Sequence, residues 1–268
     1  MPKILSCYPE GKLKALTMSY DDGVLSDKRL ASIFNENGIK GTFHINSGMF
    51  GDTRYRARLT EEESLEVYQG HEISVHTVTH PSIARCPKEQ VLYEIMDDRK
   101  NLERLFGYPV RGMSYPNGSY SQEIIEMLPI FGIEYARVVQ TTGGYQLPEN
   151  FLEWKATCHH NQNLMQHAET FVSLPRKNIN LMYVWGHSYE FDDKDNWDVI
   201  EQFCEYIGGR DDIWYATNIE IVDYVKAYKN LRFSADQHLV FNPSAQSVWV
   251  LLDEQPVEIP GGRTLTLF

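Results

Sequence analysis

The chain has 268 residues, of which 42% are hydrophobic and 23% charged, and its formal net charge is −12 at pH 7. This composition is typical of a globular protein, and a chain of this length buries enough apolar surface to fold without a disulfide or metal staple. The negative charge argues against nucleic acid or an anionic membrane as partners, because both require a positive protein surface.

The four cysteines lie far apart in the sequence and form no CxxC pair, which favours free buried thiols over a disulfide framework. They are Cys7, Cys86, Cys158 and Cys204. The N-terminal residues contain no apolar run as long as a signal-peptide core, and no stretch approaches the roughly 18 apolar residues of a membrane span. We therefore expect a cytoplasmic protein rather than a secreted one.

The first third of the chain alternates between strand and helix patterns. Asp27 is a suitable N-cap for a helix that ends at Gly38. Thr60 and Glu63 form the signature of a capping box, which predicts a second helix ending before Gly70. The predicted elements are a strand at 13–20, a helix at 27–37, a strand at 41–46, a helix at 61–69 and a strand at 72–76.

The same alternation continues to residue 228. Pro87 begins the longest predicted helix, whose apolar residues recur along one stripe up to Phe106. The run LMYVWGH at 181–187 is nearly all apolar, as expected for a strand that is buried on both faces. The other predicted elements are strands at 110–115, 133–139, 152–156 and 213–216, and helices at 121–131, 197–206 and 219–228.

Repeated strand–helix units predict a parallel sheet, and about seven or eight units over roughly 230 residues favour closure into a barrel. We assign this α/β barrel to residues 1–228. Residues 229–268 lose the helical period and contain short β-prone runs between turns, which predicts a small β appendage. The appendage either only packs on the barrel, or forms an oligomer contact or a wall of a substrate site.

Four polar clusters follow predicted strands, which is where parallel α/β folds collect reactive groups. They are SYDDG at 19–23, HTVTHP at 76–81, RGMSYPNG at 111–118 and WGH at 185–187.

His76 and His80 have the spacing of two ligands on one helical turn, and two imidazoles with a carboxylate suit Zn²⁺. An HxxxH pair also arises often by chance, and Asp-Asp-Gly is a common turn and helix cap. A carboxylate at a separate strand end, Asp22, favours the interpretation as a metal site.

Taken in order, the four clusters resemble the motifs of the polysaccharide deacetylase family, which is also called carbohydrate esterase family four. TMSYDDG at 17–23 is similar to the first motif, HTVTHP to the second, RGMSYPNG to the third, and His187 to the last. The resemblance covers roughly residues 13–227 and implies a distorted, incomplete (β/α) barrel of about seven parallel strands, with the β appendage outside it.

The resemblance also implies roles for individual residues. Asp22, His76 and His80 would hold a divalent metal ion, with zinc favoured and cobalt, nickel or manganese as alternatives. Asp21 would be the general base, and His187 the general acid.

Two further roles come from the third motif. Arg111 would pair with Asp21, and the backbone N–H of Tyr115 would face the oxyanion. The family often has an Asp-rich motif that tunes the acid histidine, but no matching Asp pair precedes His187 here. The partner that orients His187 is therefore unassigned, and Glu190 receives no role.

Three other side chains are candidates for substrate binding. Trp185 and Tyr189 flank His187 and would stack on a sugar ring, although buried packing is the usual role of aromatics beside an apolar strand. His160 would line the pocket opposite the metal, with a structural role as the alternative.

We therefore expect a metal-dependent hydrolase that removes acetyl groups from an N-acetylated carbohydrate, with an O-acetylated one less favoured. An amidohydrolase of a small non-sugar amide is the first alternative, and a non-catalytic sugar-binding protein is the second. A carbohydrate is the expected partner, with no nucleic acid and no membrane, and a homo-oligomer is compatible with the sequence.

Overall fold

A parallel sheet of nine strands forms the centre of the computed structural model, which describes residues 2–268. The order of the strands is β7-β6-β5-β4-β3-β2-β9-β8, with β10 paired to β2. Their bounds are β2 (Lys14–Asp21), β3 (Gly41–Ile45), β4 (Glu72–Val75), β5 (Gly112–Ser114), β6 (Tyr135–Thr141), β7 (Trp154–Ala156), β8 (Cys158–His159), β9 (Asn180–Gly186) and β10 (Ile213–Tyr215).

Strand β2 is the centre of this sheet, and all eight of its residues are buried. One edge of β2 pairs with β9 along most of its length. The other edge is shared, because β10 pairs with residues 14–16 and β3 with residues 18–21. The end of β2 therefore lies in the middle of the sheet edge, surrounded by the ends of its neighbours.

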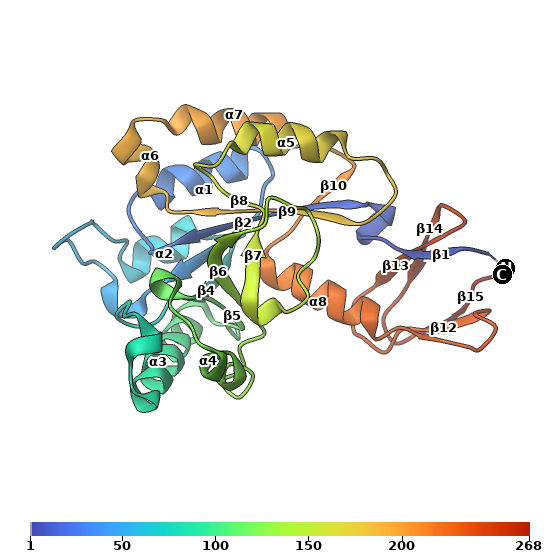
Figure 1. The fold of residues 1–268 in the computed structure, drawn as a ribbon, viewed down its shortest axis with the longest axis horizontal. Coiled ribbons are helices and arrows are strands. Elements are labelled where there is room, and N and C mark those ends of the chain that lie inside the picture. Colours follow the sequence, from blue (N-terminus) through green and yellow to red (C-terminus); the bar gives the residue numbers. More distant parts are fainter. Residues whose placement is uncertain (1) are drawn as a thin grey trace.

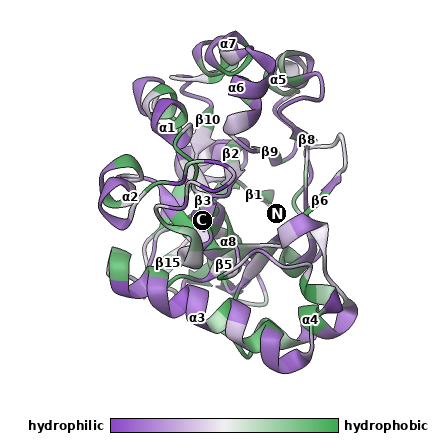
Figure 2. Ribbon diagram, turned by 90° about the vertical axis from the view of Figure 1, so that its left-hand side faces the viewer, coloured by the Kyte–Doolittle hydropathy of each residue, from purple (hydrophilic) through white to green (hydrophobic). Residues whose placement is uncertain are grey.

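Helices surround the curved sheet. Figure 1 shows α1, α5, α6 and α7 on one side and α3, α4 and α8 on the other, and Figure 2 shows helices surrounding the strands. The helices are α1 (Asp27–Glu36), α2 (Glu61–Val67), α3 (Lys88–Phe106), α4 (Gln122–Met127), α5 (Leu164–Ser173), α6 (Tyr189–Lys194), α7 (Trp197–Ile207) and α8 (Asn218–Lys229). Short 3₁₀ turns occupy η1 (Pro9–Gly11), η2 (Ser47–Met49), η3 (Ile83–Arg85), η4 (Pro116–Gly118) and η5 (Phe151–Glu153).

The predicted fold class is confirmed. Every strand predicted before residue 228 is present, and β8 is added to them. Strands β7 and β8 end the strand order without pairing to each other within residues 2–268, so the barrel is incomplete. Within the same residues, no helix is long and apolar enough to cross a bilayer.

Local signals account for which helices the sequence predicts. The capping box of Thr60 and Glu63 is present at the start of α2, and α3 ends at Gly107 with a left-handed φ of 78°. The patterns do not predict α5 and α6. Neither of these helices begins with a side-chain cap hydrogen bond.

The C-terminal residues form two small antiparallel sheets at one end of the molecule (Figure 1). One contains β11 (Arg232–Phe233), β12 (Leu239–Phe241) and β15 (Thr264–Thr266), and the other contains β1 (Ile4–Ser6), β13 (Val248–Leu252) and β14 (Gln255–Ile259). The division of the chain at residue 228 stays a prediction, and β1 from the N-terminus joins the C-terminal strands. All four cysteines are free thiols.

Tyr224 on α8 connects these sheets to the barrel. Its hydroxyl donates a hydrogen bond to the Cys7 carbonyl at 3.0 Å and accepts one from the Trp249 N–H at 2.9 Å. Because the Tyr224 side chain is buried, water cannot easily replace its hydroxyl as the partner of these two backbone groups.

We expect Tyr224→Phe to lower the free energy of unfolding by about 1–3 kcal/mol, because two backbone groups would lose their partner. Urea denaturation followed by circular dichroism measures this change. Tyr55→Phe is the matched control, because Tyr55 is 97% exposed. Equal stability of the two variants would contradict the role of Tyr224.

Candidate active site

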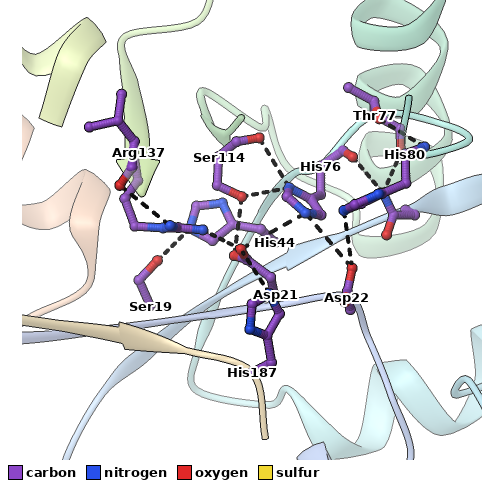
Figure 3. A network of polar contacts seen from close by, with 12 residues as sticks. Ser19, Asp21, Asp22, His44, His76, Thr77, His80, Ser114, Arg137 and His187 are labelled. Carbon is purple, nitrogen blue, oxygen red and sulfur yellow. Dashed lines mark hydrogen bonds and ion pairs between the residues drawn. The ribbon is translucent and has the colours of Figure 1, made fainter. Parts of the chain in front are cut away.

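The carboxyl ends of β2 and β4 meet at one edge of the sheet and carry the first two predicted motifs (Figure 3). Asp21 is the last residue of β2 and is followed by Asp22, and His76 directly follows β4. The backbone is left-handed at Asp22 (φ 89°), Thr77 (φ 67°) and His80 (φ 60°). Non-glycine residues rarely adopt this conformation, and they do so most often at functional sites.

Asp22, His76 and His80 bring their polar atoms together. The Asp22 Oδ1 atom lies 3.8 Å from His76 Nε2 and 3.6 Å from His80 Nε2. One ligand atom from each of the three residues lies within 4.8 Å of the other two. Asp22 Oδ1 is buried and has no hydrogen-bond partner among the described residues, so the position is suited to a cation.

The protonation of these groups also fits a metal. His76 Nδ1 lies 3.0 Å from the Ser114 carbonyl, which assigns the ring proton to Nδ1 and leaves the Nε2 lone pair facing Asp22. Burial lowers the pKa of His76 to about 4, against the attraction of Asp21, so this ring is neutral near pH 7. Although burial opposes it, the positive charge of Arg58 holds the pKa of the Asp22 carboxyl below its usual range. A carboxylate with imidazole nitrogens is a donor set that zinc prefers.

Asp21, the expected general base, is buried against a buried arginine. Its carboxylate is in direct ion-pair contact with the guanidinium of Arg137 on β6, and Ser114 Oγ donates to Asp21 Oδ1 at 3.1 Å. Burial alone would raise the pKa of Asp21, but the charge of Arg137 holds it well below its usual range. Asp21 is therefore an ionised carboxylate beside the three candidate ligands.

The expectation that Arg111 pairs with Asp21 is wrong. Arg111 precedes β5, at the opposite end of the strand from the site, and its guanidinium binds Asp223 at 2.6 and 2.8 Å and Glu134 at 3.2 Å. Arg137 takes its place from the neighbouring strand. The signal in the sequence was the single charged side chain in the middle of the apolar run YARVV.

The expectation for the Tyr115 N–H is also wrong. This N–H donates to the Arg137 carbonyl at 3.1 Å, as part of the pairing between neighbouring strands, and so does not face the reacting group. The Tyr115 side chain is buried, and its hydroxyl donates to the Leu152 carbonyl at 2.8 Å. Tyr115 thus holds the loop after β5 in place.

His187 follows β9 and faces both Asp21 and a partner that the sequence analysis missed. Its Nε2 lies 3.9 Å from Asp21 Oδ2, and its Nδ1 lies 2.8 Å from Glu190 Oε1. Burial lowers the pKa of His187, but the hydrogen bond to Glu190 and the charge of Asp21 together raise it above the ordinary value. Because α6 begins at Tyr189, the i,i+3 spacing of one helical turn is the signal that could have identified Glu190.

The three candidate substrate contacts differ in their exposure. Tyr189 lines a cavity of about 200 Å³ beside Asp22, and its ring lies 3.9 Å from the guanidinium of Arg56. Trp185 is 8% exposed and packs under the guanidinium of Arg137. His160 is 1% exposed. Of the three, Tyr189 is the one that is placed beside Asp22 in this cavity.

Arg58 is another residue that the sequence analysis did not select. Its guanidinium donates to the Asp22 carbonyl and lies 3.4 Å from Asp22 Oδ1. It lines the same cavity, whose other walls are formed by Met49, Asp52, Tyr55 and Arg56. The cavity beside the candidate metal site therefore has a polar and aromatic lining.

Comparison with known proteins shows that the part of the chain with these motifs is similar to one family. The family model for polysaccharide deacetylases matches residues 9–136, which contain both motifs of the candidate metal site. The Bacillus subtilis protein YxkH, whose name assigns it to the polysaccharide deacetylases, is 27% identical over 115 residues. This match covers 42% of the present chain and 40% of YxkH, so it spans less than half of that relative.

Solved structures share the fold at lower identity. A Mycobacterium smegmatis protein with the same family name is 16% identical, with a TM-score of 0.63 over 85% of this chain and 96% of that one. A family 4 carbohydrate esterase from Streptomyces lividans, solved in complex with acetate, is 12% identical, with a TM-score of 0.51 over 75% of this chain and 91% of that one. The family match thus shows that residues 9–136 are similar to the polysaccharide deacetylases, and the solved structures show that the chain shares their fold.

Proposed function

We propose that this protein is a divalent-metal-dependent hydrolase that removes acetyl groups from an N-acetylated carbohydrate. The observation that carries the proposal is the convergence of Asp22, His76 and His80 beside the buried, ionised carboxylate of Asp21. These three residues would hold the ion, and their donor set favours zinc over harder cations. An acetyl ester is the less favoured substrate, because the site contains a proton donor that an amine leaving group requires.

In the proposed reaction, a water oxygen bonds to the acetyl carbon and the bond from that carbon to nitrogen breaks. A divalent ion bound at this position supplies Lewis acidity and makes water a stronger acid. Asp21 removes the proton from the attacking water, and Arg137 keeps Asp21 ionised. His187 then gives its Nε2 proton to the departing nitrogen, while Glu190 holds the Nδ1 proton.

The arrangement of acid and base supports this division of roles. Asp21 and His187 have opposite pKa shifts, because a buried cation faces the first and two carboxylates face the second. Groups with pKa values moved apart in this way are typical of acid–base pairs in active sites. The aromatic rings of Tyr55 and Tyr189 line the cavity beside Asp22, as expected for a site that binds a sugar ring.

We expect Asp21→Asn to lower the rate of acetate release by about 10²–10⁴-fold, because general-base catalysis contributes a factor of this size. The metal content should stay unchanged, because Asp21 is not one of the three ligands. Acetate release from N-acetylated sugar oligomers and metal analysis of the same preparation measure the two effects. Asp236→Asn, at an exposed site, is the control, and full activity of Asp21→Asn would contradict the proposal.

A second prediction compares two arginines. Arg137→Gln should lower the stability by about 3–5 kcal/mol, because it leaves a buried carboxylate without its partner. It should also raise the pKa of Asp21, so that the acidic limb of the pH–activity profile moves to higher pH. Arg111→Gln should leave this limb in place, because Arg111 contacts Asp223 and Glu134 instead. Arg137→Lys keeps the charge and should restore part of the wild-type pH–activity profile. Identical profiles for Arg137→Gln and Arg111→Gln would refute the assignment of Arg137 as the residue that keeps Asp21 ionised.

A third prediction concerns Glu190. Glu190→Gln removes a negative charge that raises the pKa of His187, so the acid should lose its proton at lower pH. The alkaline limb of the pH–activity profile should therefore move to lower pH, while the acidic limb stays where it is. Glu205→Gln on the exposed face of α7 is the control. An alkaline limb that does not move would exclude Glu190 as the partner of the acid.

A further inference from the structure

A second group of metal-binding side chains lies beside His187, apart from the first. His159, His160 and Glu190 each place one ligand atom within 4.8 Å of the others. None of these residues belongs to the set formed by Asp22 and its two histidines. We propose that His159, His160 and Glu190 form a second divalent-metal site, which takes zinc.

The spacing of the ligand atoms supports this site. His159 Nε2 lies 3.3 Å from Glu190 Oε1, and His160 Nε2 lies 3.4 Å from Glu190 Oε2. Ligands about 2.0–2.2 Å from a tetrahedral zinc ion lie about 3.3–3.5 Å from one another. Each histidine therefore lies from one Glu190 oxygen at the separation of two ligands on one zinc ion, and the three ligand atoms lie within 4.8 Å of one another.

His160 provides the second observation. Its Nε2 atom is buried and has no hydrogen-bond partner among the described residues, although Nδ1 lies 3.3 Å from the hydroxyl of Tyr20. If Nδ1 donates to Tyr20, the Nε2 lone pair faces the Glu190 carboxylate, and a cation between them removes the repulsion. Gly186 makes room for the ring, because a Cβ atom there would lie 2.1 Å from His160 Nδ1.

The charges of the cluster also favour a cation. Burial would raise the pKa of Glu190, but the hydrogen bonds from His159 and His187 hold it well below the usual range, so it is ionised. Burial lowers the pKa of His160 to about 4, so this ring is neutral near pH 7. A hollow of about 390 Å³ on the side of α5 is lined by His160 and Asn161.

Existing contacts of His159 and Glu190 make the second site weaker than the first. Glu190 Oε2 accepts a hydrogen bond from Asn161 Nδ2 and lies 3.6 Å from Lys194 Nζ. His159 Nδ1 accepts a hydrogen bond of 3.2 Å from the Asn161 N–H, and this bond breaks when the ring proton moves to Nδ1 to free Nε2 for an ion. Glu190 Oε1 is also shared with His187. An ion bound to Glu190 therefore withdraws negative charge from the acid histidine, and we expect excess zinc to inhibit the enzyme.

Zinc binding to the intact protein tests this proposal. Equilibrium dialysis against rising free zinc should give two equivalents for the wild type, one for His80→Ala, one for His159→Ala, and none for the double variant. His238→Ala, in the C-terminal sheets, is the matched control and should keep both equivalents. Cobalt substitution adds a spectroscopic readout, because the tetrahedral bands that remain in His80→Ala report the second site alone. Circular dichroism confirms the fold of each variant, and Glu190→Gln provides a second route to the loss if His159→Ala does not fold.

The outcomes separate this proposal from the proposed function. If the wild type takes up one equivalent, and His80→Ala takes up none, the second site is excluded while the first stands. If His159→Ala loses one equivalent and His80→Ala loses none, the second site stands and the proposed metal-dependent function fails. Inhibition by excess zinc that disappears in His159→Ala supports the second site, and inhibition that is equal in both proteins contradicts it.

Discussion

The buried ion pair between Asp21 and Arg137 is the interaction on which the site depends. The Asp21 side chain is 4% exposed and that of Arg137 is fully buried. Removing an ion from water costs several kcal/mol even after relaxation, so neither side chain is stable in this position without the other. Because the arginine supplies a fixed positive charge, the aspartate stays ionised where burial alone would protonate it.

The parallel sheet brings these two residues together from distant parts of the sequence. Asp21 ends β2 and Arg137 lies within β6, with β3, β4 and β5 between them in the order of strands. The curvature of an incomplete barrel lets a long side chain from β6 cross the interior to the end of β2. The site therefore depends on the curvature of the barrel. In an open flat sheet, Asp21 and Arg137 would lie too far apart to form an ion pair.

Hydrogen bonds between helices and the loops after the strands hold His76 and His187 in position. Asp98 on α3 accepts hydrogen bonds from the backbone N–H of His76 at 3.0 Å and of Ser47 at 2.7 Å, which ties two loops to one helix. On the other side, Ser188 donates to the buried carboxylate of Asp27 at the start of α1. These contacts hold His76 and the loop of His187 in position, so that the strained backbone at the candidate metal site is supported from outside it.

The sequence by itself determined the strands of the main sheet except β8, the helices except α5 and α6, the capping box of α2, and the polar clusters at strand ends. It also predicted that Asp22, His76 and His80 would meet, because residues after parallel strands share one edge of the sheet. Only the tertiary structure decided which arginine faces Asp21, whether the Tyr115 N–H is free, and which residue orients His187. These contacts depend on the direction of a side chain along its strand and on the sharing of hydrogen bonds between strands. Neither property has a periodic signal along the chain, so the spacing of residues determines the edge at which they lie but not the partner that they contact.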